Sequence, residues 1–300
     1  MDSGQFRHFM DVPSPYFKFL FGRKGETKRR LETETETQLT IPGHGKEGPI
    51  VIVGHHRKGV LSAKTRIELL VNSARQKLPS THFLSLPMNS PEIKDSFQDF
   101  KSEVLLHCDG ARGLDGTIFQ NPDKLHLTLG MLVLLSDAEI KAARSLLQDC
   151  QDSIVDPILK AEPLIAQVQG LEYMNDDPGA VDVLYAKLDL LSSSDRLQIL
   201  VERLVEKFVA AGLMQREHER VKLHMTVINS LMRKDPTGVA VSKGDNKKGP
   251  PRESFDATDI LKNFGDVDFG EIHLKELHLS KRYTTDDNGY YACEGRLFLP

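Results

Sequence analysis

The sequence predicts an α+β protein built from two successive units, a small N-terminal one and a larger bilobal one with a central cleft. The first 77 residues alternate as strand, helix, helix, strand, strand, helix, and the rest alternates strands with amphipathic helices. The larger part repeats one short phrase, once in each half, which indicates two halves related by a pseudo-twofold axis. Pro79-Ser80 ends the last helix of the small unit, so the predicted units are residues 1–78 and 79–300.

The elements of the small unit follow from local residue patterns. Proline near its start favours a short apolar helix over 15–21, which Gly22-Arg23-Lys24-Gly25 interrupts before a charged helix over 26–35. A period of about 3.6 residues predicts a third helix over 57–77. Its apolar face comprises Val60, Leu61, Ala63, Ile67, Leu70, Val71 and Ala74. Strands are predicted over 5–12, 38–41 and 50–53.

In the larger unit, the same patterns predict helices over 91–106, 136–150 and 195–211. Ser136 and Glu139 are spaced as a capping box at the start of the second helix. Strands are predicted over 82–86, 125–135, 165–173, 183–190, 221–227, 272–279 and 290–299. The last two would pair as a terminal hairpin across residues 285–289.

Residues 232–258 are rich in Gly, Pro, Lys and Asp and read as a long mobile loop. The loop begins close to the second copy of the repeated phrase, and its basic residues would form a lid over a bound phosphate chain. These residues are Arg233, Lys234, Lys243, Lys247, Lys248 and Arg252. The alternative is a surface insertion without a role.

The repeated phrase reads Lys-Leu-His-Leu-Thr-Leu at 124–129 and Lys-Leu-His-Met-Thr-Val at 222–227. Side chains alternate faces along a strand, so His126 and Thr128 would share one face, as would His224 and Thr226. The residues between them would face a core: Leu125, Leu127, Leu129, Leu223, Met225 and Val227. Two such strands side by side would present two imidazoles and two hydroxyls to one cleft.

Such a set suits metal-free chemistry at phosphorus. One neutral imidazole accepts a proton from water, the other donates one to the leaving oxygen, and the hydroxyls bind the phosphate oxygens. With 11 histidines in the chain, a single His-x-Thr or His-x-Ser arises by chance, and His278-Leu279-Ser280 is a third instance. The competing interpretation is therefore half-buried strand histidines; only the repeated context favours a site.

A metal-dependent hydrolase is the competing enzyme class. Such a site needs closely spaced histidine and carboxylate ligands, and the chain contains no His-x-His or His-Glu-x-x-His. Three widely spaced cysteines, Cys108, Cys150 and Cys293, argue against a disulfide framework or a zinc cluster and favour a reducing compartment. We therefore expect no metal and no cofactor.

The remaining composition is that of an ordinary globular chain. A formal net charge of −4 means that nucleic acid would bind only through a local basic patch. No apolar run approaches the roughly 18 residues that span a membrane, and the N-terminal residues lack the apolar core of a signal peptide.

Gly22-Arg23-Lys24-Gly25 is the best candidate for that patch. Other Gly-x-x-Gly segments occur, but only this one joins two predicted helices and encloses two basic residues. Glycines let the backbone approach a phosphate, and the amide groups at the start of the next helix favour anions. Lys28, Arg29 and Arg30 would extend the patch. The alternative is a tight turn with a solvated charged face.

Residues 15–32, Pro-Tyr-Phe-Lys-Phe-Leu-Phe-Gly-Arg-Lys-Gly-Glu-Thr-Lys-Arg-Arg-Leu-Glu, resemble the signature of a type I KH domain. Residues 80–300 resemble the two-histidine (2H) phosphoesterases; Thr-His-Phe-Leu-Ser-Leu-Pro at 81–87 and the segment 125–132 resemble the branch related to the A-kinase anchor protein domain. The resemblance implies that Gly22, Arg23, Lys24, Gly25, Lys28 and Arg29 bind single-stranded RNA, with single-stranded DNA as an alternative.

The resemblance also implies roles for the repeated phrase and for the whole chain. His126 and His224 would transfer protons, Thr128 and Thr226 would hold the phosphate, and the substrate would be RNA or a 2′,3′-cyclic phosphate. The chain would belong to a helicase-containing transcription coactivator complex that responds to DNA alkylation. We would expect it in the nucleus, and also in the cytoplasm. The alternative is a catalytically silent RNA-binding scaffold in the same complex.

Overall fold

The computed structural model describes residues 4–43, 45–191, 195–216, 218–233 and 252–300. The chain forms two compact units, Met1–Pro79 and Ser80–Pro300, called here the N-terminal and the C-terminal unit. Each has its own hydrophobic core. Among the described residues, no helix has both the length and the apolar character to cross a membrane.

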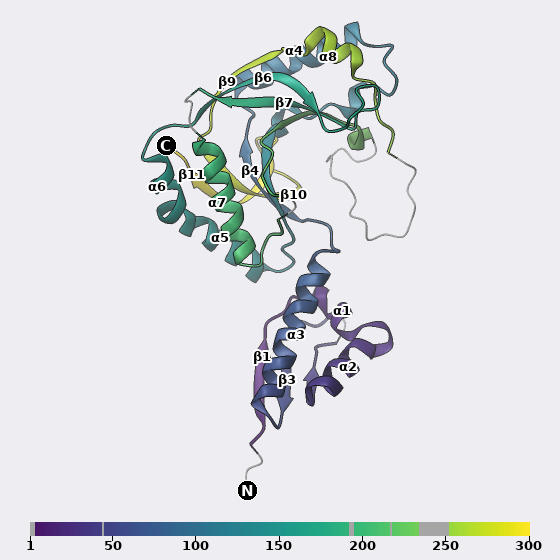
Figure 1. Ribbon diagram of the computed structural model, residues 1–300, viewed down its shortest axis with the longest axis vertical. Coiled ribbons are helices and arrows are strands. Elements are labelled where there is room, and N and C mark those ends of the chain that lie inside the picture. The colour runs from purple at the N-terminus through teal and green to yellow at the C-terminus, as the bar shows by residue number, and fades with distance from the viewer. Residues whose placement is uncertain (1–3, 44, 192–194, 217, 234–251) are drawn as a thin grey trace. The chain divides into compact units, whose positions relative to one another are not determined.

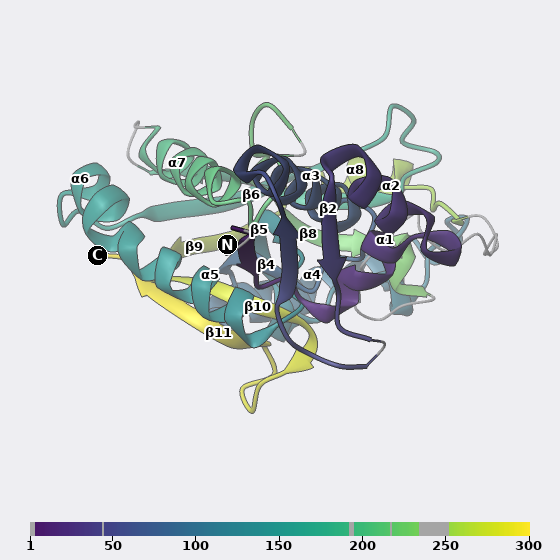
Figure 2. The same ribbon diagram turned by 90° about the horizontal axis from the view of Figure 1, so that it is seen from below.

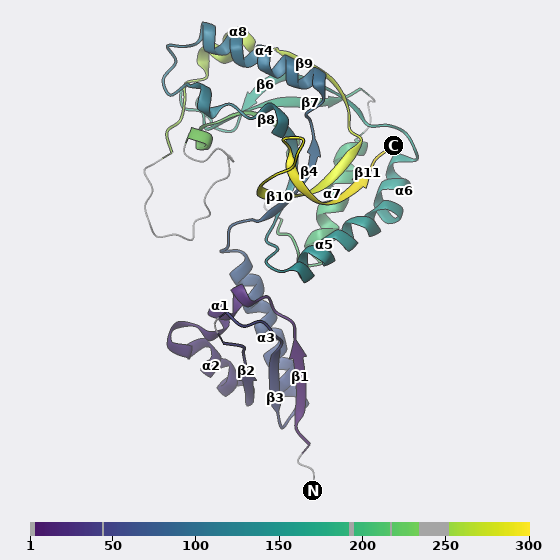
Figure 3. The same ribbon diagram turned by 180° about the vertical axis from the view of Figure 1, so that it is seen from behind.

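The N-terminal unit is a three-stranded antiparallel sheet covered on one face by helices (Figures 1 and 3). The sheet order β1-β3-β2 comes from β1 (Phe6–Met10), β2 (Thr37–Thr40) and β3 (Ile50–Gly54). The helices are α1 (Phe17–Phe21), α2 (Glu26–Thr35) and α3 (Arg57–Arg75), with 3-10 turns η1 (Ser14–Tyr16) and η2 (Arg23–Gly25). All six predicted elements are confirmed.

The predicted apolar face of α3 holds with one exception. Val60, Ala63 and Ile67 are buried against the sheet, whereas Leu61 is 50% exposed. Leu61 follows Val60 by one residue and so lies about 100° around the helix from it, away from the core. The prediction for Leu61 is wrong.

In the C-terminal unit, the described residues form an eight-stranded antiparallel sheet of order β11-β10-β4-β5-β8-β7-β6-β9. The first four strands along the chain are β4 (His82–Pro87), β5 (His126–Leu132), β6 (Ile165–Tyr173) and β7 (Val183–Leu190). The others are β8 (Met225–Asn229), β9 (Asp268–His273), β10 (Glu276–Thr285) and β11 (Tyr291–Phe298). The sheet thus consists of two four-stranded halves, with β5 and β8 as its central pair.

The two halves meet at a narrow joint. Between β5 and β8 a single residue pair, Leu127 with Met225, is aligned in the ladder, whereas β4 and β5 align at six positions. Around this joint the strand order is symmetric, because β4 and β7 are the next strands outward on either side. This is the predicted pseudo-twofold, bilobal arrangement.

Helices cover the outer surfaces of the two halves. α5 (Asp137–Cys150) packs on β11 and β10, and α7 (Arg196–Ala210) packs on β5 (Figure 2). α4 (Pro91–His107) packs on β9, and α8 (Thr258–Phe264) packs on β6 (Figure 1). The shorter pieces are η3 (Gly116–Ile118), η4 (Pro122–Lys124), η5 (Gln151–Val155), α6 (Asp156–Leu159) and η6 (Ser230–Arg233).

Two local predictions need correction. Residues 272–279 are two strands, because the chain leaves β9 at one edge of the sheet at His273 and enters β10 in the other half at Glu276. Leu274 between them is 1% exposed, so the alternation of apolar residues continues through the connection between the two strands. The sequence pattern therefore does not show where one strand ends and the next begins. At the start of α5, the Ser136 hydroxyl caps the amide of Glu139, but the Glu139 carboxylate accepts from the amide of Leu135 instead of Ser136.

The predicted mobile loop 232–258 is anchored at both ends. Residues 234–251 lie outside the described residues. Met232 is 5% exposed, and Phe255 is fully buried and paired with Val181. Residues 252–258 therefore belong to the folded core, and the predicted loop is too long.

Candidate functional site

The repeated phrase lies on both sides of the central joint. Leu127 faces Met225, so the antiparallel register sets His126 beside Thr226, and Thr128 beside His224. The four side chains therefore form a cross on one face of the sheet, around the pseudo-twofold axis. On the other face Leu125, Leu127, Leu129, Met225 and Val227 are buried as predicted, and Leu223 is partly buried. One detail differs: β8 begins at Met225, so His224 immediately precedes the strand.

Both histidines are fixed in the same tautomer. The Nδ1 atom of His126 lies 2.7 Å from the backbone oxygen of Lys124, and the Nδ1 atom of His224 lies 2.7 Å from that of Lys222. A carbonyl oxygen only accepts, so Nδ1 carries the proton in each ring. Nε2 is therefore the unprotonated nitrogen of each ring when the ring is neutral. The Nε2 of His126 lies 3.1 Å from the Thr128 hydroxyl, which donates to it when the ring is neutral.

Aromatic rings surround His126 in the first half of the site. The centroid of His126 lies 5.2 Å from Phe83, 5.4 Å from Tyr291 and 6.5 Å from Tyr290. Lys124 places its ammonium 5.0 Å from the centre of the Tyr291 ring and donates to the Thr285 hydroxyl at 2.9 Å. His126 is thus partly buried, with three aromatic rings around it.

The second half repeats this arrangement with fewer rings. Tyr185 contacts His224 with centroids 5.2 Å apart, and Lys222 lies over Tyr185 at 4.5 Å. The Tyr185 hydroxyl donates to Glu172 at 2.6 Å, and the same carboxylate lies 4.0 Å from the Lys222 ammonium. Each histidine therefore contacts a tyrosine ring that also has a lysine ammonium over it. Among the described residues, Lys222 has a carboxylate within 4.0 Å and Lys124 has none.

Sequence reasoning missed Tyr185 and Tyr291. Both come from strands remote in sequence from the repeated phrase, and neither belongs to a motif. Only the strand pairing brings them to the histidines, so no signal in the sequence identifies them. The lysines were visible as part of the repeated phrase, at the position two residues before each histidine.

Burial lowers the pKa of both histidines. For His126 desolvation lowers the pKa to about 4, the bond to the Lys124 carbonyl opposes the change, and the nearby His224 adds to it. For His224 desolvation again lowers the pKa. The hydrogen bond to the Lys222 carbonyl raises the pKa, and the charge of the Lys222 ammonium lowers it further. Without a bound anion, both rings are thus neutral at pH 7.

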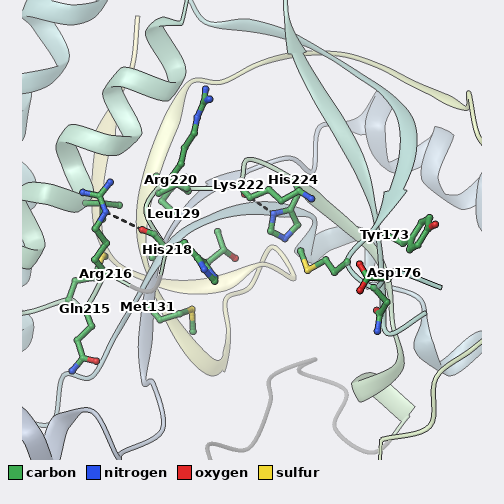
Figure 4. A pocket seen from close by; sticks show the side chains of 17 residues that line it. Leu129, Met131, Tyr173, Asp176, Gln215, Arg216, His218, Arg220, Lys222 and His224 are labelled. Atoms are coloured by element: carbon green, nitrogen blue, oxygen red, sulfur yellow. Dashed lines mark hydrogen bonds between the residues drawn. The ribbon is translucent and has the colours of Figure 1, made fainter. Parts of the chain in front are cut away.

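A cavity of about 670 Å³ opens beside His224 (Figure 4). His224 and Thr128 line it, and Figure 4 shows the His224 ring directed into it. Its apolar side includes three thioethers, Met131, Met174 and Met214. Its polar side includes Asn175, Asp176, Gln215, Arg216, His218, Arg220 and Lys222. Neither His126 nor the rings around it are among the lining residues.

Gly130 makes room for Met214 in one wall of this cavity. A Cβ atom at this position would lie 2.4 Å from the sulfur of Met214, closer than packed atoms approach. The absence of a side chain two residues after Thr128 therefore lets Met214 lie against β5. No group of three or more His, Cys, Asp or Glu residues is placed to hold a metal ion in the part of the chain that the structure describes.

The third His-x-Ser sequence lies buried in β10. His278 is 6% exposed on β10, where its Nε2 atom lies 2.7 Å from Glu276, and Ser280 bonds to Ser85 at 2.9 Å. Tyr290 donates to the same Ser85 hydroxyl at 3.0 Å. The hydroxyls of Ser280, Ser85 and Tyr290 thus form a hydrogen-bonded chain that links β10 to β4.

In the N-terminal unit, Gly22-Arg23-Lys24-Gly25 forms a tight connection between α1 and α2. Gly22 has φ 66° and ψ −179°, and Gly25 has φ 77°. A Cβ at Gly22 would lie 2.1 Å from the Thr27 hydroxyl oxygen, so this position requires glycine. Lys24 has φ 53°, an uncommon conformation for a residue other than glycine.

The basic residues of this loop divide into two groups. Arg29 turns back and donates to the backbone oxygens of Lys24 (2.7 Å) and Gly25 (3.3 Å), and Lys28 lies 3.7 Å from Glu32. Arg23 and Lys24 are exposed and, with Arg29 and Arg30, line a surface hollow of about 780 Å³ that also includes Glu26 and Glu34. Arg29 thus both holds the loop and lines the hollow, whereas Arg23, Lys24 and Arg30 only present charge to solvent.

The two described basic residues of the predicted lid are engaged within the protein. Arg233 donates to Asp115 at 3.0 Å and to the backbone oxygen of Glu253 at 3.0 Å. Arg252 lies 3.2 Å from Asp182 and donates to Ser230 at 2.8 Å. For these two residues the lid prediction is wrong. The lysines at 234, 243, 247 and 248 lie outside the described residues.

Comparison with known proteins supports both units. Residues 80–299 match the AKAP7 2'5' RNA ligase-like domain, and residues 7–69 match the KH domain. Two solved structures are similar: E. coli LigT complexed with 3'-AMP, and the first KH type I domain of human Vigilin. LigT is 14% identical, with 74% of this chain and 98% of LigT covered and a TM-score of 0.44. The Vigilin domain is 25% identical, with coverage of 24% and 76% and a TM-score of 0.23.

One curated relative spans nearly the whole chain. The activating signal cointegrator 1 complex subunit 1 of Mus musculus is 47% identical over 296 residues, which cover 97% of this chain and 83% of that protein. The chain therefore belongs to the family of that subunit, and combines a KH domain with an AKAP7 2'5' RNA ligase-like domain of 2H phosphoesterase fold.

Proposed function

We propose that the chain is an RNA-binding phosphodiesterase that uses its two histidines, without a metal ion, on RNA or cyclic-phosphate ends. The observation that carries the proposal is the paired Nε2 geometry. Two imidazoles in the same tautomer lie on either side of a pseudo-twofold axis, each with the hydroxyl of Thr128 or Thr226 beside it.

A phosphate on this axis would meet both Nε2 atoms and both hydroxyls. One neutral imidazole takes a proton from the attacking water as the new P–O bond forms. The other, as an imidazolium, gives its proton to the oxygen whose bond to phosphorus breaks. Thr128 and Thr226 donate to the remaining phosphate oxygens, whose negative charge grows in the transition state.

The KH domain supplies the RNA-binding part of the proposal. Arg23 and Lys24 are exposed beside a loop whose glycines leave the backbone accessible, which favours the phosphates of a single strand. We assign RNA binding to Gly22, Arg23, Lys24 and Gly25, with Arg30 adding charge and Arg29 supporting the loop. Single-stranded DNA is the alternative ligand.

The name of the mouse relative supports a place in a complex. We propose that this chain is a subunit of the helicase-containing activating signal cointegrator complex, acts in transcription coactivation and the alkylation-damage response, and works in the nucleus and also in the cytoplasm. Co-purification from nuclear and cytoplasmic extracts tests this assignment. Recovery of the chain without a helicase from both extracts would contradict it.

A catalytically silent RNA-binding scaffold is the second candidate. The observation in its favour is that both imidazoles are neutral at pH 7 in the unliganded site, whereas the reaction needs one of them charged. The negative charge of a bound phosphodiester would raise both pKa values and favour the charged form of one ring.

One experiment separates the two candidates. Purified chain is incubated with short oligonucleotides that end in a 2′,3′-cyclic phosphate, a 3′-phosphate or a free 3′-hydroxyl, beside a His126→Ala/His224→Ala double variant. Product from the unmodified chain alone supports the phosphodiesterase. Equal RNA binding by both proteins, with product from neither, supports the scaffold.

A further inference from the structure

A hollow of about 380 Å³ lies on the C-terminal unit, where the starts of β4 and α5 meet β10. It is called here the Arg282 hollow, and it shares no lining residue with the cavity beside His224. Its walls combine apolar side chains, Leu134, Leu135 and Ile140, with charged ones, Asp137, Lys281 and Arg282.

Arg282 is unusual because its charge is buried without an acidic partner. The residue is 4% exposed, and within the described ranges its guanidinium forms no ion pair with a carboxylate. Nη1 donates to the backbone oxygen of Ser80 at 2.7 Å. Nε and Nη2 are buried and have no hydrogen-bond partner among the residues that the structure describes. A guanidinium is always charged, so these unmet donors favour the binding of an anion.

The two unpartnered nitrogens lie on one edge of the guanidinium. Nε–H and the nearer N–H of Nη2 point in the same direction, which matches the two oxygens of a carboxylate or a phosphate. The other edge is occupied by Ser80. α5 begins at this hollow with Ser136 as its N-cap, and the start of a helix also favours an anion.

The other charges around the hollow favour a single negative charge. Lys281 lies 3.7 Å from Glu294, so of the two cations in the hollow only Arg282 lacks a carboxylate partner among the described residues. Asp137, in the first turn of α5, repels a phosphate dianion more strongly than a monoanion. The apolar walls suit an apolar group beside the anion. These features match a carboxylate next to an apolar side chain, as in a protein segment.

His82 indicates that the bound segment also donates a hydrogen bond. The Thr81 hydroxyl donates to the backbone oxygen of Leu134 at 3.0 Å, so it accepts from Nδ1 of His82 at 2.8 Å. Burial lowers the pKa of His82 to about 4, so the ring is neutral at pH 7 and Nε2 is unprotonated. Nε2 has no donor within the described part of the chain. A peptide carries N–H groups beside its carboxylate, whereas a carboxylate alone has none.

Tyr283 lies over the guanidinium. Its ring centre is 4.9 Å from Cζ of Arg282, and the residue is 58% exposed. Its φ of 63° is uncommon for an aromatic residue. An exposed side chain changes rotamer rapidly, so this ring can turn away and give a ligand access to Nε and Nη2.

We propose that the Arg282 hollow binds a carboxylate of a protein partner, which Nε and Nη2 of Arg282 hold side by side. An apolar side chain next to the carboxylate packs in the hollow, and a main-chain N–H of the same segment is the donor that His82 lacks. The carboxylate belongs to an acidic side chain or to a C-terminus, which present the same chemistry. This binding does not depend on the phosphodiesterase function, because no residue of the hollow belongs to the histidine site.

The first test observes Arg282 directly. In the proton–nitrogen correlation spectrum of the full chain, the Nε–H signal of Arg282 is identified by its loss in Arg282→Lys. It is expected to shift on titration with acetyl-Leu-Glu-Leu-amide or with acetyl-Ala-Leu-Leu that has a free C-terminus. Acetyl-Leu-Gln-Leu-amide and acetyl-Ala-Leu-Leu-amide lack the carboxylate and are expected to leave it in place. The carboxylate peptide with the lower Kd identifies the source of the carboxylate.

The second test supplies a carboxylate within the chain. Ile140 is partly buried and lines the hollow, so Ile140→Glu brings a carboxylate into it. The Kd of the carboxylate peptides is expected to be at least about tenfold higher in Ile140→Glu than in the matched control Ile140→Gln, because the new carboxylate competes for Arg282. The two variants have side chains of the same size, so their difference reports charge. Equal Kd values would overturn the proposal even if Arg282→Lys does not fold.

The third test concerns access to the guanidinium. Tyr283→Gly removes the ring and suits the positive φ of this position. The Kd is expected to fall at least about threefold, because a covered site binds only during the fraction of time that it is open. Lys160→Gly, at an exposed residue with φ 50°, is the matched control and should change nothing. An unchanged Kd in Tyr283→Gly overturns Tyr283 as the cover.

The remaining outcomes also decide the proposal. Absence of a shift with both carboxylate peptides, or equal shifts with their uncharged counterparts, overturns it. A shift with sodium phosphate and with neither carboxylate peptide overturns it as well, because the hollow would then bind phosphate.

Discussion

The Gly-x-x-Gly loop and the two-histidine site suit the same group, a phosphate, by different means. In the loop the decisive positions have no side chain: Gly22 leaves no room for a Cβ beside Thr27. In the histidine site the decisive positions are side chains held at fixed orientation, with Nδ1 bonded to a backbone oxygen in each ring. A phosphate would meet mainly backbone and mobile charge in the loop, and titratable groups in the site.

This difference predicts different sensitivities. Binding at the loop should follow salt concentration, because it depends on counterions released by Arg23 and Lys24. Events at the histidine site should follow pH, because imidazole changes its charge in the accessible range. Perturbing one region should therefore leave the property of the other unchanged.

The largest expected effect is on turnover. Replacement of His126 or His224 by alanine should each lower kcat/KM on an RNA end by roughly 10²–10⁴-fold, because one proton transfer is lost. RNA affinity measured on the same variants should remain unchanged. His107→Ala, at an exposed position of α4, is the matched control. Retention of full activity by either site variant would contradict the two-histidine mechanism.

The second effect concerns RNA affinity. Arg23→Asp/Lys24→Asp should weaken single-strand binding at least about tenfold and flatten the log–log salt slope by about 1.4, at about 0.7 for each lost phosphate contact. Filter binding across a salt series measures both. Lys58→Asp/Lys77→Asp makes the same change of charge at exposed positions outside the hollow. Equal loss in both variants would mean that net charge, and not the loop, sets the affinity.

The third effect is on the stability of the N-terminal unit. Gly22→Ala should destabilise it by about 1–3 kcal/mol, because the backbone conformation suits glycine alone and the added Cβ meets Thr27. Gly43→Ala, where a Cβ has open space, should change little. Thermal unfolding of both variants measures the difference. Turnover at the histidines should be unaffected, and a parallel loss of activity would show that the two regions depend on each other.

The fourth effect is the position of the pH optimum. The reaction needs one imidazole neutral and the other charged, and burial lowers the pKa of His126 to about 4 and also lowers the pKa of His224. The value of kcat/KM should therefore fall at acid pH, where both rings are charged, and at pH 7, where both are neutral. The profile should thus be a bell lying below pH 6.5. A maximum above pH 7.5 for the free enzyme would contradict these directions.

Stability of the C-terminal unit should also respond to acid. His82 is 2% exposed and His126 is partly buried, and burial lowers the pKa of each from 6.5 to about 4. A lowered folded pKa means that the unfolded chain binds protons first. Stability is therefore complete above pH 6.5 and is lost as the pH falls from 6.5 towards 4. Denaturant unfolding at pH 7 and pH 5 measures this loss of stability independently of the change in kcat/KM.

The smallest expected effect is none. Turnover should persist in EDTA, because imidazoles and hydroxyls of this chain surround the proposed phosphate position. Loss of activity in EDTA with recovery on adding one metal ion would contradict the mechanism. His278→Gln serves as a check that a histidine outside the cross is not required.

The sequence predicted local elements well and spatial neighbours poorly. Helix boundaries such as Glu26–Thr35 and strands such as Ile165–Tyr173 were found because capping residues, glycines and periodicity are local signals. The juxtaposition of the two copies of the phrase was predicted because the phrase repeats. The rings of Tyr185 and Tyr291 were not found, because strand order is decided by long-range packing.

Two further features have local causes that the sequence does not show. Arg29, which is predicted to bind RNA, also donates to the backbone oxygen of Lys24, five residues earlier, and its contact with RNA stays a prediction. The break between β9 and β10 was missed because Leu274 is apolar and buried although it connects two strands that belong to different halves. The residue types alone do not show that an arginine contacts its own loop or that a buried leucine lies between two strands.

The backbone bonds at Nδ1 have a consequence for engineering and for divergence of the chain. In many proton-transferring sites the histidine is oriented by a carboxylate side chain, which a single substitution removes. Here the orienting oxygens of Lys124 and Lys222 belong to the main chain, and any residue at either position supplies one. The orientation of both imidazoles is therefore insensitive to side-chain replacement at 124 and 222. Those two positions are left free to vary in charge and to tune the electrostatics of the cleft without disturbing its geometry.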